Sequence, residues 1–327
     1  MRRAIIVGTG SHLPEGVLTN ADFEQMVDTS DKWIVERTGV RERHILTDEK
    51  LATSDMATAA SAHALEMANM QPTDLDCIIL ATVTADMTCP SGAVRVQQKL
   101  GANNAFAFDV SAACAGSLLG LDIGATLIES GRIRNALVIG AESISRIVNY
   151  QDRNTCVLFG DAAGAMVLRA ADETTRGVLA VVTHTDGRQW ELIHVPAGGS
   201  ALPGKKVTDP TLFTVHMSGR EVFKFAVRAL ADLSHELMRR CQLVNTDIHW
   251  VVPHQANRRI LEALSQKLAI PLERFIINIE HTGNTSSASV PMALDQGVRD
   301  GRIRQGEAVL MLAIGSGMAW SGAIVRW

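Results

Sequence analysis

Two stretches of this chain repeat one another. The tetrapeptide GRIR occurs at Gly131 to Arg134 and again at Gly301 to Arg304, 170 residues later. A short apolar run follows each copy, NALVIGAES in the first case and GEAVLMLAIGSG in the second. Both runs are rich in aliphatic residues and end in Gly or Ser, which predicts two buried strands. The repeat constrains the chain to a fold with two similar halves.

Further matches precede each GRIR copy in the same order. The segments AFAFDVSAACAGSLLGLDIGATLIESG and FIINIEHTGNTSSASVPMALDQGVRDG each predict a strand, a turn of small residues and a helix. At the same 170-residue offset, Cys114 aligns with Asn284. A third pair, TDLDCIILATV from Thr73 and TDIHWVVPHQA from Thr246, repeats at an offset of 173. Three matches in one order indicate a duplicated architecture.

This alternation of apolar strands and helices predicts mostly parallel sheets that are covered by helices on both faces. The chain of 327 residues can form two core-bearing units, because single hydrophobic cores stop growing near this size. We therefore expect halves of residues 1–174 and 175–327, with a boundary near residues 172 to 178. Pseudo-twofold symmetry would bring together turns at the carboxyl ends of strands, where α/β folds form their sites.

Composition excludes several classes of protein. A net charge of −4 and a pI near 6.2 argue against a nucleic-acid binder, because phosphate contacts need a basic surface. The five cysteines form no CxxC pair, which predicts reduced thiols and no thiolate metal site. The first apolar run predicts a strand rather than a signal peptide, and Gly and Ser interrupt the apolar stretch Val309 to Val325, which argues against a membrane span. We expect a cytoplasmic protein.

Cys114 lies in DVSAACAGSLLG, between a predicted strand and a helix whose first residues are small. A helix N-terminus offers free N–H groups and a partial positive charge, which favour the thiolate and predict a lowered cysteine pKa. A cysteine taken alone is more often a small core residue, and we apply that interpretation to the other four. The strand-to-helix turn favours a nucleophile at Cys114.

His254 follows the run IHWVVP, where Pro253 ends a predicted strand and a helix begins between Gln255 and Arg259. A neutral imidazole there could donate through Nε2 to a thioester oxygen and stabilise the enolate formed when a β-carboxylate leaves as carbon dioxide. Most of the ten histidines are expected at the surface or in the core. His281 is the nearest competitor for the role.

Two turns of small residues complete the expected site. Asn284, in HTGNTSSASVP, carries an amide that can donate without titrating. An Asx-turn or a helix cap is the alternative role, but the alignment with Cys114 favours catalysis. Near the end of the chain, AIGSGMAWSG supplies flexible backbone that could bring the Ser316 N–H beside the Cys114 N–H as an oxyanion hole.

Several longer motifs together resemble one known family, β-ketoacyl-acyl-carrier-protein synthase III of the thiolase superfamily. They are DTSDKWIVERTGVRERHI, DVSAACAG, DRNTCVLFGDAAGA, VVPHQANRRI, HTGNTSSASVP and GSGMAWSGAIVRW, and they cover essentially the whole chain. The resemblance implies a five-layered αβαβα fold of two pseudo-symmetric halves, assembled as a homodimer. It places Cys114, His254 and Asn284 at the family's catalytic positions.

The resemblance also implies a site for coenzyme A. Trp33, Arg37 and Arg153 match the positions that hold the adenine and the phosphates of that ligand. Aromatic stacking and cation contacts suit it. Without the motif, Trp33 would be interpreted as a surface anchor and the two arginines as parts of solvated salt bridges.

The family's reaction implies the substrates. A cysteine takes an acyl group from acyl-CoA and then condenses it with malonyl-acyl carrier protein, which yields a 3-oxoacyl carrier protein, coenzyme A and carbon dioxide at the start of type II fatty acid synthesis. No metal and no cofactor are expected, because the acyl-CoA is a substrate. Carrier proteins are acidic, so a basic patch is expected to bind them. The candidates are Lys224, Arg258, Arg259 and Lys267, with a solvated charged face as the alternative.

Three residues are expected in the acyl pocket, namely Cys89, Phe159 and Ile314. Ile314 replaces a common Phe and precedes a Gly-Ser-Gly turn where three glycines are usual, which is expected to alter decarboxylation. Cys89 replaces the Phe that in some members reaches across the dimer to cap the pocket. A smaller residue there is expected to admit longer or branched primers.

Other functions stay open. An enzyme of secondary metabolism could use the same catalytic residues with another acyl-CoA primer, and some such relatives carry a Gly-Ser-Gly turn. A non-catalytic thiolase-fold partner subunit would only shape a chain-length tunnel, although such subunits usually lack the cysteine. A degradative thiolase is disfavoured because it needs a second catalytic cysteine, which the turn at residues 315–317 does not carry.

Overall fold

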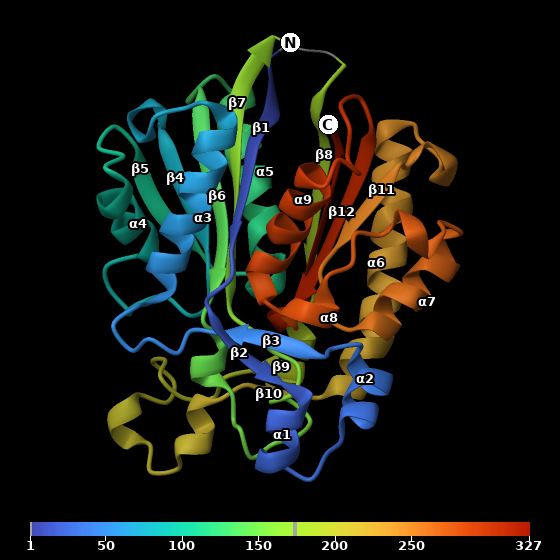
Figure 1. Ribbon diagram of the computed structural model, residues 1–327. Helices are drawn as coiled ribbons and strands as arrows, with labels where there is room; N and C mark the ends of the chain where they lie inside the picture. The colour runs from blue at the N-terminus through green and yellow to red at the C-terminus, as the bar shows by residue number, and fades with distance from the viewer. Residues whose placement is uncertain (1, 173–174) are drawn as a thin grey trace.

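Two β-sheets form the centre of the molecule in the computed structural model, which describes residues 2–172 and 175–327 (Figure 1). The first sheet has the strand order β1-β7-β6-β4-β5, and the second has the order β8-β13-β12-β11. The strands are β1 (Arg2–His12), β4 (Cys77–Ala81), β5 (Phe106–Val110), β6 (Asn135–Glu142), β7 (Ala162–Asp172), β8 (Gly177–Thr185), β11 (Trp250–Pro253), β12 (Ala308–Gly315) and β13 (Ala319–Arg326).

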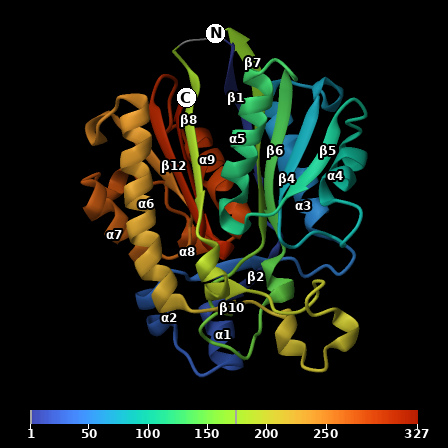
Figure 2. The same ribbon diagram turned by 180° about the vertical axis from the view of Figure 1, so that it is seen from behind.

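Helices lie between the two sheets and on both outer faces (Figures 1 and 2). The central helices are α5 (Gly116–Glu129) and α9 (Ser289–Arg299). The outer helices are α3 (Thr53–Ala68) and α4 (Gly92–Leu100) on the first sheet, and α6 (Gly219–Cys241) and α7 (Arg258–Leu268) on the second. The expected five-layered αβαβα fold is confirmed.

Strand pairing repeats between the sheets. β6 runs parallel to β4 and antiparallel to β7, and β12 runs parallel to β11 and antiparallel to β13. The outer strands β1 and β8 are antiparallel to β7 and β13. The prediction of mostly parallel sheets is therefore wrong. In the second sheet the reason is the short turn between β12 and β13, because a connection without a crossover segment can join only antiparallel neighbours.

The position of each helix explains its pattern of apolar residues. α5 lies between the two sheets, and Leu118, Leu121 and Ile128 belong to the cluster that fills this layer. α6 and α7 cover only the outer face of the second sheet, so their buried residues form one stripe and charged residues occupy the other side. The two runs that follow GRIR form β6 and β12, and both predictions of buried strands are confirmed.

Smaller elements cluster at the end of the sheets where β4, β5, β6, β11 and β12 finish, at the bottom of Figure 1. β2 (Gly16–Thr19) pairs with β3 (Glu42–Ile45), and β9 (Ile193–His194) pairs with β10 (His216–Met217). The short helices here are α1 (Asn20–Met26), α2 (Asp31–Thr38) and α8 (Ile279–Thr282). The Ser30 hydroxyl accepts from the Trp33 N–H at 3.2 Å and so begins α2.

The two halves differ at the strand next to β4 and β11. In the first half β5 pairs with β4 along its length, whereas in the second half Phe275 makes only an isolated bridge to Val251. The strand predicted from FIINIE is therefore absent. The side chain of Gln255 replaces the ladder, because its Oε1 accepts from the N–H groups of Asn278 (3.0 Å) and Ile279 (3.2 Å).

The boundary between the halves, predicted near residues 172 to 178, includes residues 173–174, which lie outside the described residues, and it stays a prediction. The first apolar run forms the strand β1, as expected. Of the helices in the described part of the chain, none has the length and apolar character needed to span a bilayer.

Candidate active site

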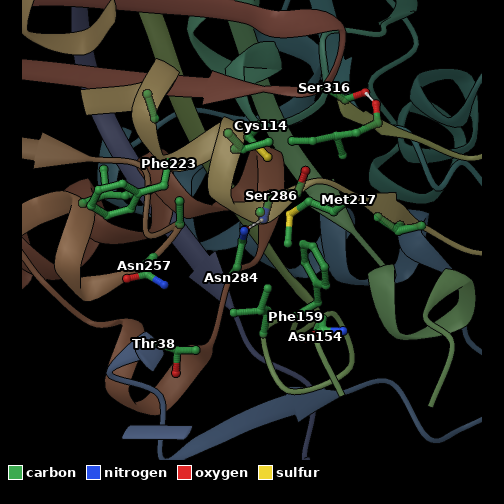
Figure 3. A pocket seen from close by; sticks show the side chains of 18 of the residues that line it. Thr38, Cys114, Asn154, Phe159, Met217, Phe223, Asn257, Asn284, Ser286 and Ser316 are labelled. Carbon is green, nitrogen blue, oxygen red and sulfur yellow. Dashed lines mark hydrogen bonds between the residues drawn. The ribbon is translucent and has the colours of Figure 1, made fainter. Parts of the chain in front are cut away.

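A cavity of about 930 Å³ opens where the smaller elements meet the ends of the strands. Cys114, His254 and Asn284, which come from three separate turns, all line it. Figure 3 shows the side chains of Cys114, Asn284 and Ser286 around one space, with Phe159 and Met217 nearby. Among the described residues, no group of three or more His, Cys, Asp or Glu side chains is arranged to hold a metal ion.

Cys114 lies in a short 3₁₀ turn, η2 (Ala113–Ala115), that joins β5 to α5. Ala113 has a φ of 45°, a left-handed conformation that is unfavourable for a residue with a Cβ atom. Strain of this kind persists only where the surrounding structure enforces it. Here the sharp turn places the Cys114 side chain in the wall of the cavity.

The turn after β12 lies directly against the Cys114 backbone. A Cβ atom on Gly315 would stand 2.6 Å from the Cys114 nitrogen, so only glycine permits this approach. The 3₁₀ turn η10 (Ser316–Met318) comes next, and Ser316 lines the same cavity. Its hydroxyl donates to the Ile193 carbonyl at 2.5 Å, which fixes the turn to β9.

His254 follows β11, and its backbone N–H donates to the Leu312 carbonyl of β12 at 2.6 Å. The side chain is buried, and no described residue bonds its Nδ1 atom. Burial lowers the pKa of His254 to about 3, because the imidazolium would lose its hydration. The ring is therefore neutral near pH 7. The competing residue His281 is exposed and pairs with Glu42 at 3.1 Å, away from the cavity.

Asn284 is held by its backbone and by its side chain. Its N–H donates to the Leu158 carbonyl at 2.8 Å, and its carbonyl accepts from the Gly160 N–H at 3.1 Å. Its Oδ1 accepts from the Ser286 N–H at 2.9 Å, which is the Asx-turn contact that was the alternative role. The two roles are compatible, because this bond fixes the amide plane and leaves Nδ2 as the donor that a ligand can reach.

The environment of the thiol differs from expectation. The pKa of Cys114 is raised to about 12, mainly by burial and to a smaller extent by the Glu142 carboxylate, while the Ser286 side chain acts in the opposite direction. The predicted lowering of this pKa is therefore wrong. One reason is that α5 begins only after the η2 turn, so the thiol lies before the helix rather than on its first residues.

Sequence analysis missed Glu142, which ends β6 behind the nucleophile and is fully buried. Burial raises the pKa of Glu142, and its hydrogen bonds oppose this rise. A glutamate at the end of an apolar strand is usually exposed, so the sequence does not indicate that Glu142 is buried. The only signal in the sequence is the presence of Thr and Ser residues in two other turns, which could act as hydrogen-bond donors. The donors to its carboxylate are the Thr84 (2.6 Å), Thr82 (3.2 Å), Ser286 (3.1 Å) and Ser287 (3.0 Å) hydroxyls and the Val83 N–H (3.1 Å).

The three residues expected to hold coenzyme A lie together. The guanidinium of Arg37 is 5.8 Å from the centre of the Trp33 ring, and that of Arg153 is 5.2 Å from it. Trp33 and Arg37 line the cavity, whereas Arg153 does not. Arg153 instead donates to the Asp28 carbonyl at 2.6 Å, which holds it beside the tryptophan.

The four residues expected to bind a carrier protein do not form one patch at the cavity. Lys224 on α6 and Arg259 on α7 line it. Arg258 forms an ion pair one turn along α7 instead, and Lys267 lies in the last turn of that helix. Arg220 also lines the cavity. Arg220 was not predicted from the sequence, because it lies outside the motifs that resemble the family.

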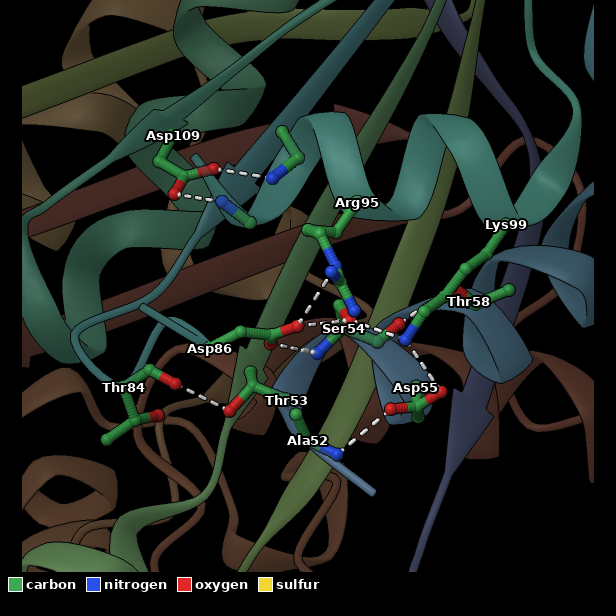
Figure 4. A network of polar contacts seen from close by, with 12 residues as sticks. Ala52, Thr53, Ser54, Asp55, Thr58, Thr84, Asp86, Arg95, Lys99 and Asp109 are labelled. Carbon is green, nitrogen blue, oxygen red and sulfur yellow. Dashed lines mark hydrogen bonds and ion pairs between the residues drawn. The ribbon is translucent and has the colours of Figure 1, made fainter. Parts of the chain in front are cut away.

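Of the residues expected in the acyl pocket, Phe159 and Ile314 line the cavity. Cys89 is exposed and is not among the lining residues of this chain. The loop that carries it is fixed at its base, where the Asp86 carboxylate accepts from the N–H (2.9 Å) and the hydroxyl (2.6 Å) of Ser54 (Figure 4).

Comparison with known proteins gives consistent matches. The family model described as 3-oxoacyl-[acyl-carrier-protein (ACP)] synthase III matches residues 108–187, and its C-terminal counterpart matches residues 238–327. A β-ketoacyl-[acyl-carrier-protein] synthase III of Caldanaerobacter subterraneus subsp. tengcongensis is 50% identical over 323 residues, which cover 98% of this chain and 97% of the relative.

Solved structures agree with these matches. The crystal structure of 3-oxoacyl-[acyl-carrier-protein] synthase III from Aquifex aeolicus VF5 has a TM-score of 0.92 at 42% identity and covers 99% of this chain and 100% of that one. The priming β-ketosynthase of the R1128 polyketide biosynthetic pathway has a TM-score of 0.91 at 35% identity, with 98% and 95% covered.

Proposed function

Because the chain belongs to the β-ketoacyl-[acyl-carrier-protein] synthase III family of condensing enzymes, we propose that it initiates fatty acid synthesis. In this proposal it transfers an acyl primer from acyl-CoA to Cys114 and condenses that primer with malonyl-[acyl-carrier-protein]. The observation that carries the proposal is the convergence of Cys114, His254 and Asn284 on one cavity with basic residues at its rim.

The first half reaction is acyl transfer. The Cys114 sulfur attacks the thioester carbonyl carbon, the bond from that carbon to the sulfur of coenzyme A breaks, and the thiol proton ends on the departing sulfur. The N–H groups of Cys114 and Ser316 stabilise the negative oxygen of the tetrahedral intermediate. The approach of Gly315 to the Cys114 nitrogen supports this role, because it brings the two turns together.

The second half reaction is decarboxylative condensation. The malonyl carboxylate leaves as carbon dioxide, and the electron pair of the broken bond forms an enolate on the remaining thioester. His254 and Asn284 donate hydrogen bonds to the enolate oxygen. Its carbon attacks the acyl group on Cys114, which releases the thiolate and 3-oxoacyl-[acyl-carrier-protein]. The lowered pKa of His254 supports a neutral donor.

Two surfaces at the mouth bind the two substrates. Trp33 stacks on the adenine of coenzyme A, and Arg37 and Arg153 pair with its phosphates; their proximity to the tryptophan supports this assignment. The acidic carrier protein docks on the basic residues Lys224, Arg258, Arg259 and Lys267. The support is strongest for Lys224 and Arg259, because they line the cavity itself.

The enzyme acts as a homodimer that forms along β5. This strand is at the edge of the first sheet, and Phe106 on it is 47% exposed and stacks with Phe108 at 6.2 Å. An apolar edge strand of this kind favours pairing with another copy. In such a dimer the exposed Cys89 would cap the partner's cavity. Light scattering of the purified protein tests the dimer, and a monomer at micromolar concentration would contradict it.

The main proposal is tested by incubating the purified protein with acetyl-, isobutyryl-, octanoyl- and anthraniloyl-CoA. Mass spectrometry should find a primer-sized adduct on Cys114, and malonyl-[acyl-carrier-protein] should then yield the 3-oxoacyl product. No adduct with any primer would favour an inert subunit.

A role in secondary metabolism is the second candidate, favoured by the similarity to the R1128 priming ketosynthase. Sole use of the aromatic primer would support it and contradict the fatty acid proposal.

A further inference from the structure

Glu142 lies behind the nucleophile, and neither half reaction assigns it a task. Its carboxylate is fully buried, and its partners are hydroxyls and one backbone amide, with no cation among those that the described residues supply. A buried carboxylate without a counter-ion is costly. Such a group is therefore a candidate for a chemical role.

Two adjacent serines bond the same carboxylate oxygen, but they differ in what else they contact. Ser286 and Ser287 lie 3.1 Å and 3.0 Å from Glu142 Oε1. The Ser286 side chain also lines the cavity beside Cys114 (Figure 3) and lowers the pKa of the Cys114 thiol. The Ser287 hydroxyl instead faces the Ala81 carbonyl at 2.8 Å. Of the two serines, Ser286 is thus the one whose side chain acts on both the Cys114 thiol and Glu142.

The backbone at Ser286 enforces this arrangement. Its φ is 50°, which is left-handed and unfavourable for a residue with a Cβ atom. Its N–H donates to Asn284 Oδ1 at 2.9 Å, so the amide and the hydroxyl of one residue serve two different members of the site. The strained backbone is thus that of the residue whose hydroxyl bonds the Glu142 carboxylate.

We propose that Glu142 is a positioning residue that takes up the thiol proton of Cys114 through Ser286 during acyl transfer and returns it to the sulfur of the departing coenzyme A. This inference rests on the proposed acyl transfer. As the Cys114 sulfur bonds the carbonyl carbon, its proton passes to Ser286 Oγ and the Ser286 hydroxyl proton passes to Glu142 Oε1.

Breaking of the second carbon–sulfur bond leaves an electron pair on the coenzyme A sulfur, and the two transfers then run in reverse to protonate it. The carboxylate is regenerated, and no other reactant is needed.

The other titratable group at the site is a weaker base. Burial lowers the pKa of His254 to about 3 but raises the pKa of Glu142. A general base is most effective when its pKa lies near the working pH, so Glu142 suits proton uptake and His254 suits neutral donation. The titratable side chain that faces Glu142 is Cys114 on η2. The other groups around the carboxylate are neutral, namely the hydroxyls and the amide N–H from residues 82–84 and the hydroxyls of residues 286–287.

This assignment implies a pH dependence. Acyl transfer requires the ionised carboxylate, and burial raises its pKa. The wild-type acylation rate should therefore fall as the pH drops through this raised value and should level off above it. The variant Glu142→Gln lacks the carboxylate, so its acylation rate should not level off at high pH. The rate should instead rise with pH throughout, because the reactive thiolate then forms only as the Cys114 thiol loses its proton to solvent.

The test uses the purified full chain and separates the two half reactions. Rapid quench and mass spectrometry follow the adduct on Cys114 from about pH 5.5 to about pH 9.5, and condensation is followed from isolated acyl-enzyme with malonyl-[acyl-carrier-protein]. Glu142→Gln and Ser286→Ala should each slow acylation about 100-fold and leave condensation nearly unchanged. Ser287→Ala is the matched control, because it loses a bond to the same oxygen but does not contact the thiol.

Equal slowing of acylation by Ser286→Ala and Ser287→Ala would overturn the proposed proton transfer through Ser286. A Glu142→Gln enzyme whose acylation rate depends on pH in the same way as that of the wild type would overturn it too. If Glu142→Gln fails to fold, the serine pair still decides the question. A wild-type protein without any adduct would instead contradict the proposed function, so the two failures are distinguishable.

Discussion

The turn that carries Cys114 and the turn that carries Asn284 occupy equivalent positions in the two halves, yet they are held differently. Ala113 and Gly283, which precede them, both have a positive φ, 45° and 64°. The first turn follows a complete strand, β5, whereas the second follows a segment bonded to the Gln255 side chain. Turns with a similar backbone conformation at the preceding residue therefore present a thiol in one half and an amide in the other.

The halves also differ in the residues between each turn and the next helix. α5 begins directly after η2, but the turn η9 (Ser286–Ala288) comes between Asn284 and α9. The residues of η9, which correspond to the first turn of α5, supply the two serine hydroxyls that reach Glu142 in the first half. The second half thus supplies the hydrogen bonds that connect it to Glu142 of the first half. Substitutions in each half should show what each contributes to the two half reactions.

Removal of the nucleophile should have the largest effect. Cys114→Ala should lower condensation about 10⁴-fold or more and abolish the adduct, because no other cysteine is among the described residues that line the cavity. Mass spectrometry and a coupled condensation assay measure this. Cys156→Ala is a control for a buried cysteine outside the cavity, and an adduct that persists in Cys114→Ala would disprove the division of labour.

Removal of the amide should break only the second half reaction. Asn284→Ala should slow condensation about 10²–10³-fold, the typical cost of losing one donor to a developing negative oxygen. Acylation of Cys114 should stay close to the wild-type rate. Separate assays of the two half reactions check this, and equal losses in both would show that the turn only supports the structure.

Gln255 should matter for stability more than for chemistry. Gln255→Leu leaves the N–H groups of Asn278 and Ile279 without their acceptor. Each buried unsatisfied group costs about 1–3 kcal/mol, so with two such groups the free energy of unfolding should fall by about 2–6 kcal/mol. Urea unfolding measures this. A change below about 0.5 kcal/mol would mean that the segment does not need the glutamine as a substitute for a strand.

The smallest effect is expected at the rim, where the first half would hold coenzyme A and the second half the carrier protein. Arg259→Ala should raise the KM for malonyl-[acyl-carrier-protein] about 3- to 10-fold at low salt and leave the KM for acyl-CoA unchanged, because a rim charge acts mainly on association. Lys267→Ala, at the far end of α7, is the matched comparison and should have a smaller effect, because Lys267 does not line the cavity. An equal effect of both would show that proximity to the cavity does not determine how much each basic residue contributes to docking.

Repetition in the sequence predicted the strands β4, β6, β11 and β12 and the layers around them. It could not predict the loss of the strand at Phe275, because a long-range bond to Gln255 replaces a local preference there. The convergence of Cys114, His254 and Asn284 on one cavity was expected from their turns. Glu142 was not, because burial of a charged side chain depends on hydroxyl partners that lie far apart in the chain.

The contact of Gly315 with the Cys114 backbone has a consequence during translation. Cys114 is translated 201 residues before Gly315, so under the proposed mechanism a nascent chain exposes the thiol before the turn that would place the Ser316 N–H beside it. A polypeptide that stops before Gly315 should therefore form no acyl adduct on Cys114.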